Sequence, residues 1–129
     1  MKIEDIKFKA KRLDNGEWII GSFVVMKIPA LSKTTIGIVA AGGATLHEVD
    51  PATVCQVTGL KDCEGKELFE HDLIHFVGHK PIGEVIWSEE NYAFMVASGN
   101  EPLYWLSDVQ EIGKIEIVGN KFDRKEGEK

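Results

Sequence analysis

The residues that most directly suggest chemistry are three histidines, His71, His75 and His79, which recur every four residues. On a helix this spacing would bring successive side chains within about 6 Å, close enough to share a zinc ion. On a strand, residues four apart lie about 13 Å from each other, whereas zinc holds its ligand nitrogens at about 2.1 Å. Residues 73–77 are rich in β-forming residues, so we expect a strand here and predict no metal site.

A nucleotide site is suggested by the glycine-rich run over residues 37–44. A phosphate loop continues with a Lys and a Ser or Thr that contact phosphate and magnesium, and these are missing after Gly42. The sequence has no G-x-G-x-x-G fingerprint either. We interpret the run as a glycine-rich connection between strands.

The two cysteines, Cys55 and Cys63, are spaced neither as a zinc pair nor as a redox Cys-x-x-Cys. No G-x-S-x-G elbow occurs, and neither cysteine has the sequence context of a nucleophile. Cys55 falls on an expected strand, where a small core residue would fit. We predict that both are free thiols in a reducing compartment.

Carboxylates are numerous enough to supply acid–base chemistry or a magnesium site. The candidates are Glu64, Glu67, Glu70, Asp72 and the pair Glu89-Glu90. In a chain with 21 acidic residues, such groups arise by chance. We predict no catalytic residue, no cofactor and no metal ligand, and an enzyme stays open as an alternative hypothesis.

Four aromatic residues are the predicted partner-binding residues: Trp87, Tyr92, Tyr104 and Trp105. Tyr104 and Trp105 are adjacent on an expected strand, so their side chains point to opposite faces and at most one can enter the core. Trp87 and Tyr92 flank an expected hairpin turn and could extend the same patch. Small barrels dock peptides or stack bases on such patches. The alternative is that each ring belongs to the core or is covered by the N-terminal hairpin.

A second group is predicted to be architectural: Gly59, Asp62, Gly65 and Asp72 form the expected structural turn. Gly59 and Gly65 bracket a turn-rich segment, in which Asp62 can accept hydrogen bonds from the amides ahead of it. Glu70 and Asp72 precede an apolar strand, where a carboxylate bonded to backbone N–H groups would fix how the chain enters it.

The elements that position these residues are expected to be short strands. Residues 6–11 alternate apolar and lysine side chains, which is typical of a strand with one buried face. The Asp14-Asn15-Gly16 run predicts a turn into a second strand over residues 18–27, and residues 34–39 predict a third. Residues 45–49 and 53–58 complete an N-terminal β-sheet subdomain over residues 1–58.

Five further strands are predicted over residues 73–77, 82–87, 92–96, 103–106 and 115–118, and residues 59–66 between the two groups are predicted to be turns. Five strands in about 60 residues, with a one-turn helix at residues 107–110, best suit an SH3-like small barrel. We therefore predict an all-β fold with an N-terminal antiparallel hairpin and sheet, an SH3-like barrel subdomain over residues 59–120, and a charged tail over residues 121–129 that frays.

A formal net charge of −6 argues against wholesale nucleic-acid binding, because phosphate affinity comes from clustered Lys and Arg. The charge is unevenly spread. Residues 1–12 carry five basic residues against two acidic ones, and residues 61–72 carry two basic against five acidic. These segments could serve as contacts between copies of the chain or with a partner.

The longest apolar stretches, residues 23–26 and 37–44, fall far short of the roughly 20 residues needed to cross a bilayer. The N-terminus alternates charged and apolar residues and builds no secretory apolar region. We expect no membrane association and a cytoplasmic location in the host cell.

Two runs have a distinctive residue order, VDPATVCQVTGLKD at 49–62 and GKELFEHDLI at 65–74. Three shorter pieces accompany them, KFKA at 7–10, GEVIW at 83–87 and IVGNKFD at 117–123. In this order the chain resembles the YopX family of phage and prophage proteins. The resemblance implies a phage or prophage setting and an all-β fold with a barrel-like C-terminal part, and it supplies no catalytic residues.

The chain departs from the family at three positions. Cys55 and His71 stand where the family usually has glycine, and Lys121 stands where it usually has an apolar residue. If the family glycine serves a positive φ, the turn around His71 must differ or be strained.

Taken together, these observations predict a non-enzymatic phage or prophage accessory protein. We expect it to bind a protein partner from host or phage and to form a homo-oligomer. The alternative is nucleic-acid binding through the basic first strand and the barrel aromatics.

Overall fold

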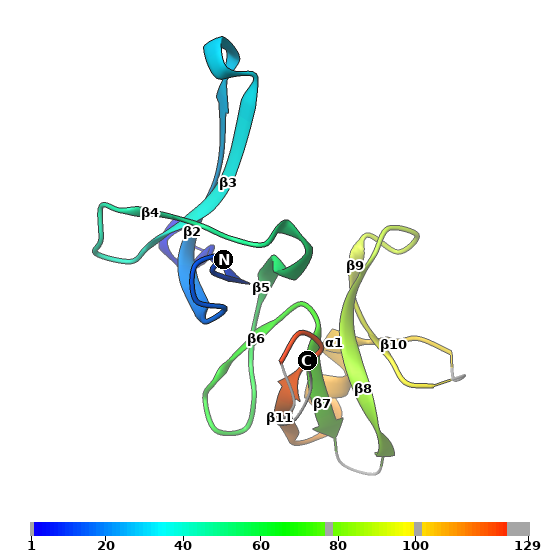
Figure 1. Ribbon diagram of the computed structural model, residues 1–129. Coiled ribbons are helices and arrows are strands. Elements are labelled where there is room, and N and C mark those ends of the chain that lie inside the picture. Colours follow the sequence, from blue (N-terminus) through cyan, green and yellow to red (C-terminus); the bar gives the residue numbers. More distant parts are fainter. Residues whose placement is uncertain (1, 77–78, 100–101, 124–129) are drawn as a thin grey trace. The chain divides into compact units, whose positions relative to one another are not determined.

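A computed structural model describes residues 2–76, 79–99 and 102–123 of the protein (Figure 1). Over these residues the fold is mostly β, with two antiparallel sheets and one short α-helix, which confirms the predicted class. The chain divides into two units, Met1–Val57 (unit 1) and Thr58–Lys129 (unit 2), and each has its own hydrophobic core.

The first sheet has six strands in the order β4-β3-β2-β1-β5-β6. Their bounds are β1 Phe8–Lys11, β2 Trp18–Ile28, β3 Lys33–Ala40, β4 Leu46–Glu48, β5 Cys55–Lys61 and β6 Glu67–Phe69. Among the described residues, three short 3-10 helices precede or connect these strands: η1 Ile3–Asp5, η2 Pro29–Leu31 and η3 Pro51–Thr53. Strand β5 continues from unit 1 into unit 2.

The alternation in the first strand places one face of β1 in the core of unit 1. Ala10 is fully buried beside Ile38 and Val49, and the ring of Phe8 meets that of Phe23 with centroids 5.3 Å apart. The predicted turn brings β2 back along β1, and Gly16 supplies its positive φ of 73°.

The second sheet has five strands in the order β10-β9-β8-β7-β11, all in unit 2. The strands are β7 Asp72–Phe76, β8 His79–Ser88, β9 Ala93–Ala97, β10 Tyr104–Trp105 and β11 Ile115–Asn120, with helix α1 Leu106–Ile112 before the last. The core of unit 2 consists of Leu68, Ile74, Val85, Val96, Leu106, Val109 and Ile115. Helix α1 contributes Leu106 and Val109, which lie three residues apart on one helix face.

A closed barrel was predicted for unit 2, but the described strands form an open sheet with β10 and β11 at its edges. Strand β10 consists of two residues, and α1 begins directly after it, which leaves too little strand to pair with β11. The turn between β5 and β6 lies along β11 instead, where Cys63 donates its backbone N–H to the carbonyl of Ile115 at 2.8 Å.

The prediction that residues 59–66 consist entirely of turns is partly wrong. Residues 59–61 continue β5, and the unpredicted strand β6 follows the turn, in which Gly65 has a φ of 82°. Gly59 also has a positive φ, 92°, within β5. The predicted one-turn helix is α1, which spans Leu106–Ile112. No helix in the described parts of the chain is long and apolar enough to cross a membrane.

The first residues of the predicted tail are hydrogen-bonded. Lys121 donates its backbone N–H to the carbonyl of His71 at 2.9 Å, and Asp123 donates its own to that of Asn120 at 2.9 Å. Residues 124–129, the rest of the predicted tail, lie outside the described residues.

Candidate functional site

Strand β9 determines where two of the aromatic candidates lie. Trp87 pairs with Phe94, and the two rings meet edge to face with centroids 5.1 Å apart. Tyr104 pairs with Val96, and its ring meets that of Phe76 edge to face at 5.8 Å. Because Phe94 and Val96 are two residues apart on β9, Trp87 and Tyr104 share the sheet face that carries the core.

Trp105 lies on the opposite face, where it pairs with Met95, which in turn pairs with Ile86. Tyr104 and Trp105 therefore point to opposite faces, and neither is fully buried, with 37% and 44% of their surface exposed. The four aromatic candidates do not form one continuous patch.

Tyr92 is the most exposed of the four, with 81% of its surface accessible. It lies in the turn between β8 and β9 with a left-handed φ of 50°, a conformation that costs an ordinary residue about 1–2 kcal/mol. Asn91 donates both its backbone N–H and its side-chain amide to the Ser88 hydroxyl, at 3.3 and 3.1 Å. The turn therefore presents the exposed residues Glu89, Glu90 and Tyr92 on a hydrogen-bonded backbone.

Asp62 organises the turn between β5 and β6. Its Oδ1 accepts hydrogen bonds from the backbone N–H groups of Glu64 and Lys66 at 2.9 and 2.8 Å. Its Oδ2 accepts one from the N–H of Ile117 in β11 at 3.4 Å. Burial alone would raise the pKa of Asp62, but the three backbone donors outweigh burial and hold this pKa below its usual value.

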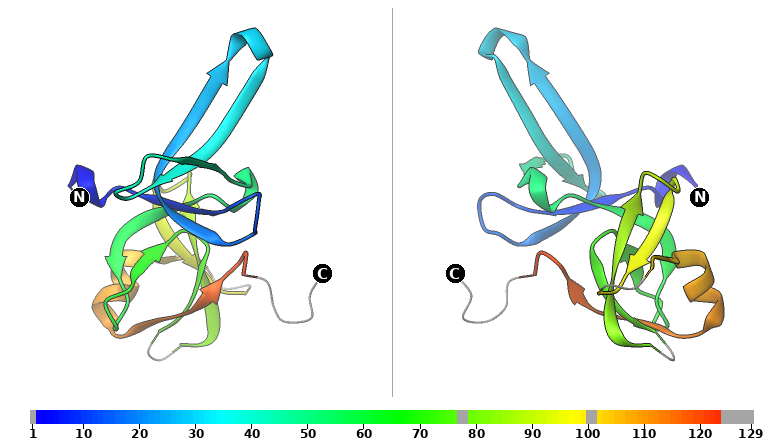
Figure 2. Two further views of the ribbon diagram at one scale, coloured as in Figure 1. Left: turned by 60° about the vertical axis from the view of Figure 1, so that its left-hand side comes forward. Right: turned by 90° about the vertical axis from the view of Figure 1, so that its right-hand side faces the viewer.

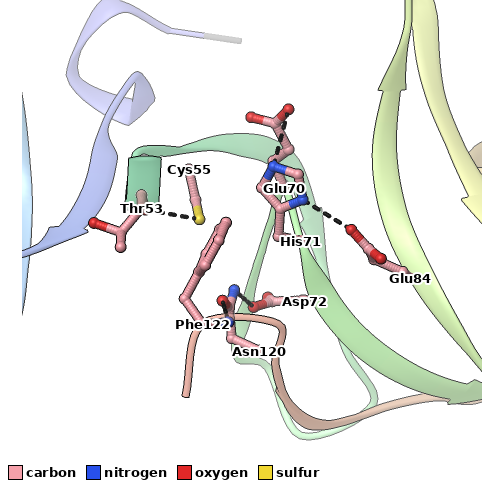
Figure 3. Close-up of polar contacts among 8 residues, drawn as sticks. All are labelled: Thr53, Cys55, Glu70, His71, Asp72, Glu84, Asn120 and Phe122. Atoms are coloured by element: carbon pink, nitrogen blue, oxygen red, sulfur yellow. Dashed lines mark hydrogen bonds and ion pairs between the residues drawn. The ribbon is translucent and has the colours of Figure 1, made fainter. Parts of the chain in front are cut away.

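Asp72 is buried and joins two segments that are far apart in the sequence (Figure 3). Its Oδ2 accepts a hydrogen bond from the backbone N–H of Phe69 at 2.8 Å, and its Oδ1 accepts one from the side-chain amide of Asn120 at 2.9 Å. Asn120 Oδ1 in turn accepts the N–H of Phe122 at 2.9 Å. The buried carboxylate thus connects the start of β7 to the end of β11.

His71, beside Asp72 in the turn between β6 and β7, has a left-handed φ of 70°. Its backbone N–H donates to the carbonyl of Val85 at 2.6 Å, and its carbonyl accepts the N–H of Lys121 at 2.9 Å. Three pieces of the family-like sequence, around positions 71, 85 and 121, therefore meet at one backbone position.

The His71 imidazole lies between two carboxylates. Nδ1 is 2.9 Å from Glu84 Oε2, Nε2 is 3.6 Å from Glu70 Oε2, and the ring meets that of Phe122 at a centroid distance of 5.2 Å (Figure 3). A general base needs a ring nitrogen directed at its substrate. Because both nitrogens of His71 face carboxylates of unit 2, this arrangement orients the ring and reinforces the turn.

The three histidines lie on different parts of unit 2. His71 precedes β7, His75 is an exposed residue of β7 that lines a small groove with Lys114, and the side chain of His79 lies outside the described residues. Within the described part of the chain, no three His, Cys, Asp or Glu residues are placed to hold a metal ion.

Sequence reasoning missed an open groove of about 340 Å³ between the β5–β6 turn and the end of α1. Its lining is Lys61, Asp62, Cys63, Gln110, Gly113, Lys114 and Ile115. The groove combines two lysines with the exposed free thiol of Cys63. The other free thiol, Cys55, is buried in unit 1 and donates to the carbonyl of Thr53 at 3.2 Å (Figure 3). The groove has no local sequence signal, because its two halves are far apart in the chain.

The basic first strand carries a cluster of lysines with an aromatic ring. The Nζ atoms of Lys9 and Lys11 lie 4.7 and 5.5 Å from the centroid of the Trp18 ring. Lys7 directly precedes β1 in the sequence. In unit 1, two lysine ammonium groups therefore lie over one half-buried aromatic ring.

The candidate turn and the corner at His71 and Asp72 lie within the part of the sequence that matches a known family. A family model described as YopX protein matches residues 7–126. None of the curated proteins with which the chain was compared matches it. Since the matched region covers nearly the whole sequence, the chain belongs to the YopX family.

Proposed function

We propose that the protein is a non-enzymatic accessory protein of a phage or prophage that binds a protein partner in the host cytoplasm. The observation that carries this proposal is Tyr92, a large aromatic residue that is 81% exposed and held at a positive φ. Glycine or asparagine would fit this turn at lower cost, so the fold alone does not require a tyrosine here. Strain of this kind concentrates at functional positions.

The charge around Tyr92 indicates the chemistry of the partner. Glu89 and Glu90 are exposed in the same turn, and Trp87 lies at the end of β8 with 42% of its surface accessible. Carboxylates beside aromatic rings suit a peptide that carries basic and apolar side chains. The same carboxylates repel the phosphates of a nucleic acid, which favours protein over nucleic acid at this turn.

The strand order supports the same proposal. The order β10-β9-β8-β7-β11, with a short helix before the last strand, is that of an SH3-like meander, here with its sheet open. SH3-like folds dock peptides against exposed aromatic side chains. We infer that the end of the sheet formed by β8, β9 and β10 is the docking surface.

Affinity capture from prophage-induced host cells, compared between the wild type and Tyr92→Gly, tests the proposal. Glycine keeps the left-handed backbone and removes the ring, so the fold should persist while capture of the specific partner falls at least tenfold. Leu13→Gly, which removes a 60% exposed side chain from unit 1, is the control and should keep the partner. A partner retained by Tyr92→Gly would refute this docking surface.

Nucleic-acid binding is the second candidate function, favoured by the contacts of Lys9 and Lys11 with Trp18. Lysines neutralise phosphates, and an exposed aromatic ring can stack on a base. Gel shifts with single- and double-stranded DNA and RNA over a salt titration test it. Binding should weaken steeply as salt rises, and no shift at low salt would eliminate this function.

A further inference from the structure

The β2–β3 hairpin continues past the strands that flank it in unit 1 (Figures 1 and 2). At the base of its outer part, residues 22–36, Phe23 and Ile36 pack against the core of unit 1. Strand β1 pairs with β2 at residues 18–21 only, and β4 pairs with β3 at residues 37–39 only. The β2–β3 register continues without a shift to Ile28↔Lys33. We call residues 22–36 the arm.

The arm exposes apolar side chains on both of its faces. Val25 and Met26 are adjacent on β2 and so point to opposite faces, with 50% and 44% of their surface accessible, and Leu31 at the tip is 67% exposed. A two-stranded ribbon is only marginally stable in water. The arm would therefore gain stability from a further strand beside it.

The arm also presents a regular, open backbone edge. Residues 22–28 of β2 have β3 as their sole strand neighbour within the described residues. Natural edge strands are usually guarded by bulges, prolines or charges. This edge is unbulged, Pro29 lies just beyond its end, and Lys27 is its single charged residue.

We propose that the arm is the interface between two copies of this chain, whose β2 edges pair antiparallel about a two-fold axis at Val25. The sequence is self-complementary in this register. Val24 faces Met26 of the second copy, and Lys27 faces Phe23 of the second copy. The two Lys27 residues then lie about 13 Å apart along the strands, beyond the screening length of about 8 Å at physiological salt.

The charge of the arm supports a second copy as its occupant. Residues 18–46 contain no acidic residue, and their two charged residues, Lys27 and Lys33, lie towards the tip. The edge centre is therefore purely apolar, which suits pairing with an identical apolar edge. Seven paired residues per copy are fewer than the roughly 20–30 of a standard interface, so the dimer should be reversible and concentration-dependent. The inference concerns unit 1 and is independent of the function proposed for unit 2.

Sedimentation equilibrium of the full chain, from low micromolar to near-millimolar concentration, tests the proposal. Val25→Glu places two carboxylates opposite each other at the two-fold axis, and Val25→Lys places two ammonium groups there. Each variant alone should dimerise at least tenfold more weakly than the wild type, because like charges in an interface repel. An equimolar mixture of the two variants should form a heterodimer at least as tight as the wild-type dimer.

Leu13→Glu is the matched control, since it makes the same kind of change at a residue that is 60% exposed and lies outside the arm. It should dimerise like the wild type, and circular dichroism checks that every variant is folded. A monomeric wild type at all concentrations would overturn the proposal. So would a Val25→Glu variant that dimerises like the wild type, or a mixture of Val25→Glu and Val25→Lys that fails to pair.

Discussion

His71 holds a left-handed backbone conformation that costs an ordinary residue about 1–2 kcal/mol and costs glycine almost nothing. Its φ of 70° is the strain expected if glycine at this position in the family serves a positive φ. The contact of its imidazole with Glu84 at 2.9 Å and the edge contact with Phe122 offset part of that strain. The contacts of the His71 side chain thus compensate in part for the cost of a backbone conformation that glycine would adopt freely.

Replacing His71 with glycine and with alanine separates the backbone strain from the side-chain contacts. Both variants lose the imidazole, but alanine keeps the strain that glycine relieves. We expect His71→Gly to be more stable than His71→Ala by about 1 kcal/mol in free energy of unfolding. Urea denaturation of the two variants under identical conditions measures the difference.

The same pair of substitutions at His75 is the control. His75 lies in β7, has no positive φ and is exposed. There the order should reverse, with alanine more stable than glycine by about 0.5–1 kcal/mol, as is usual within a strand. Alanine equal to or more stable than glycine at position 71 would contradict the strain argument.

For single residues, the sequence predicts the direction of a side chain where alternation along a strand determines it. It does not predict which residue of a turn adopts a positive φ. The opposite directions of Tyr104 and Trp105 follow from their adjacency on a strand. The positive φ at Tyr92 does not follow from residue type, because asparagine tolerates this conformation better than tyrosine and Asn91 is its neighbour. The whole turn, held through Ser88, determines which residue adopts the left-handed angle.

At the scale of elements, Asp62 connects the β5–β6 turn to β11 through one carboxylate. Its pKa is lowered in the folded protein, so its contribution to stability is complete above the unfolded value of about 3.9. That contribution is lost as the pH falls through the folded pKa. Asp62→Asn cannot titrate, so between about pH 5 and pH 2 the wild type should lose more unfolding free energy than the variant.

Urea denaturation over this pH range checks the prediction, with Glu90→Gln as the control for removing one negative charge. Asparagine can still accept the N–H groups of Glu64 and Lys66 through its Oδ1, so the turn should keep its structure. If the free energy of unfolding changed with pH in the same way in the wild type and in Asp62→Asn, protonation of Asp62 would not be coupled to unfolding.

Strands in which apolar and polar residues alternate clearly can be predicted from the sequence, but the strands with which they pair cannot. The alternation of lysines with apolar residues around β1 predicts which face of the strand is buried, because every second residue is apolar. Strand β6 is three residues long, which is too short to show an alternation of apolar and polar residues. The open sheet in unit 2 depends on how β10 and β11 pair across α1, and the free edge of the arm depends on where β1 stops. Both are long-range features that a local pattern does not contain.

At the scale of the whole chain, each unit buries a core of its own. Ile38 is fully buried in the core of unit 1, and Ile74 is fully buried in the core of unit 2. The residues packed around each core come from the same unit. Separate cores favour local opening of one unit while the other stays protected.

Native-state amide hydrogen exchange can resolve the two units in matched core variants. Ile38→Ala should lower the opening free energy of amides in unit 1 by about 2–5 kcal/mol, and Ile74→Ala should do the same in unit 2. Each variant should leave the amides of the other unit near their wild-type protection. Because β5 runs through both units, its amides should respond to both substitutions. Equal loss of protection in both units after either substitution would show instead that the two cores unfold as one.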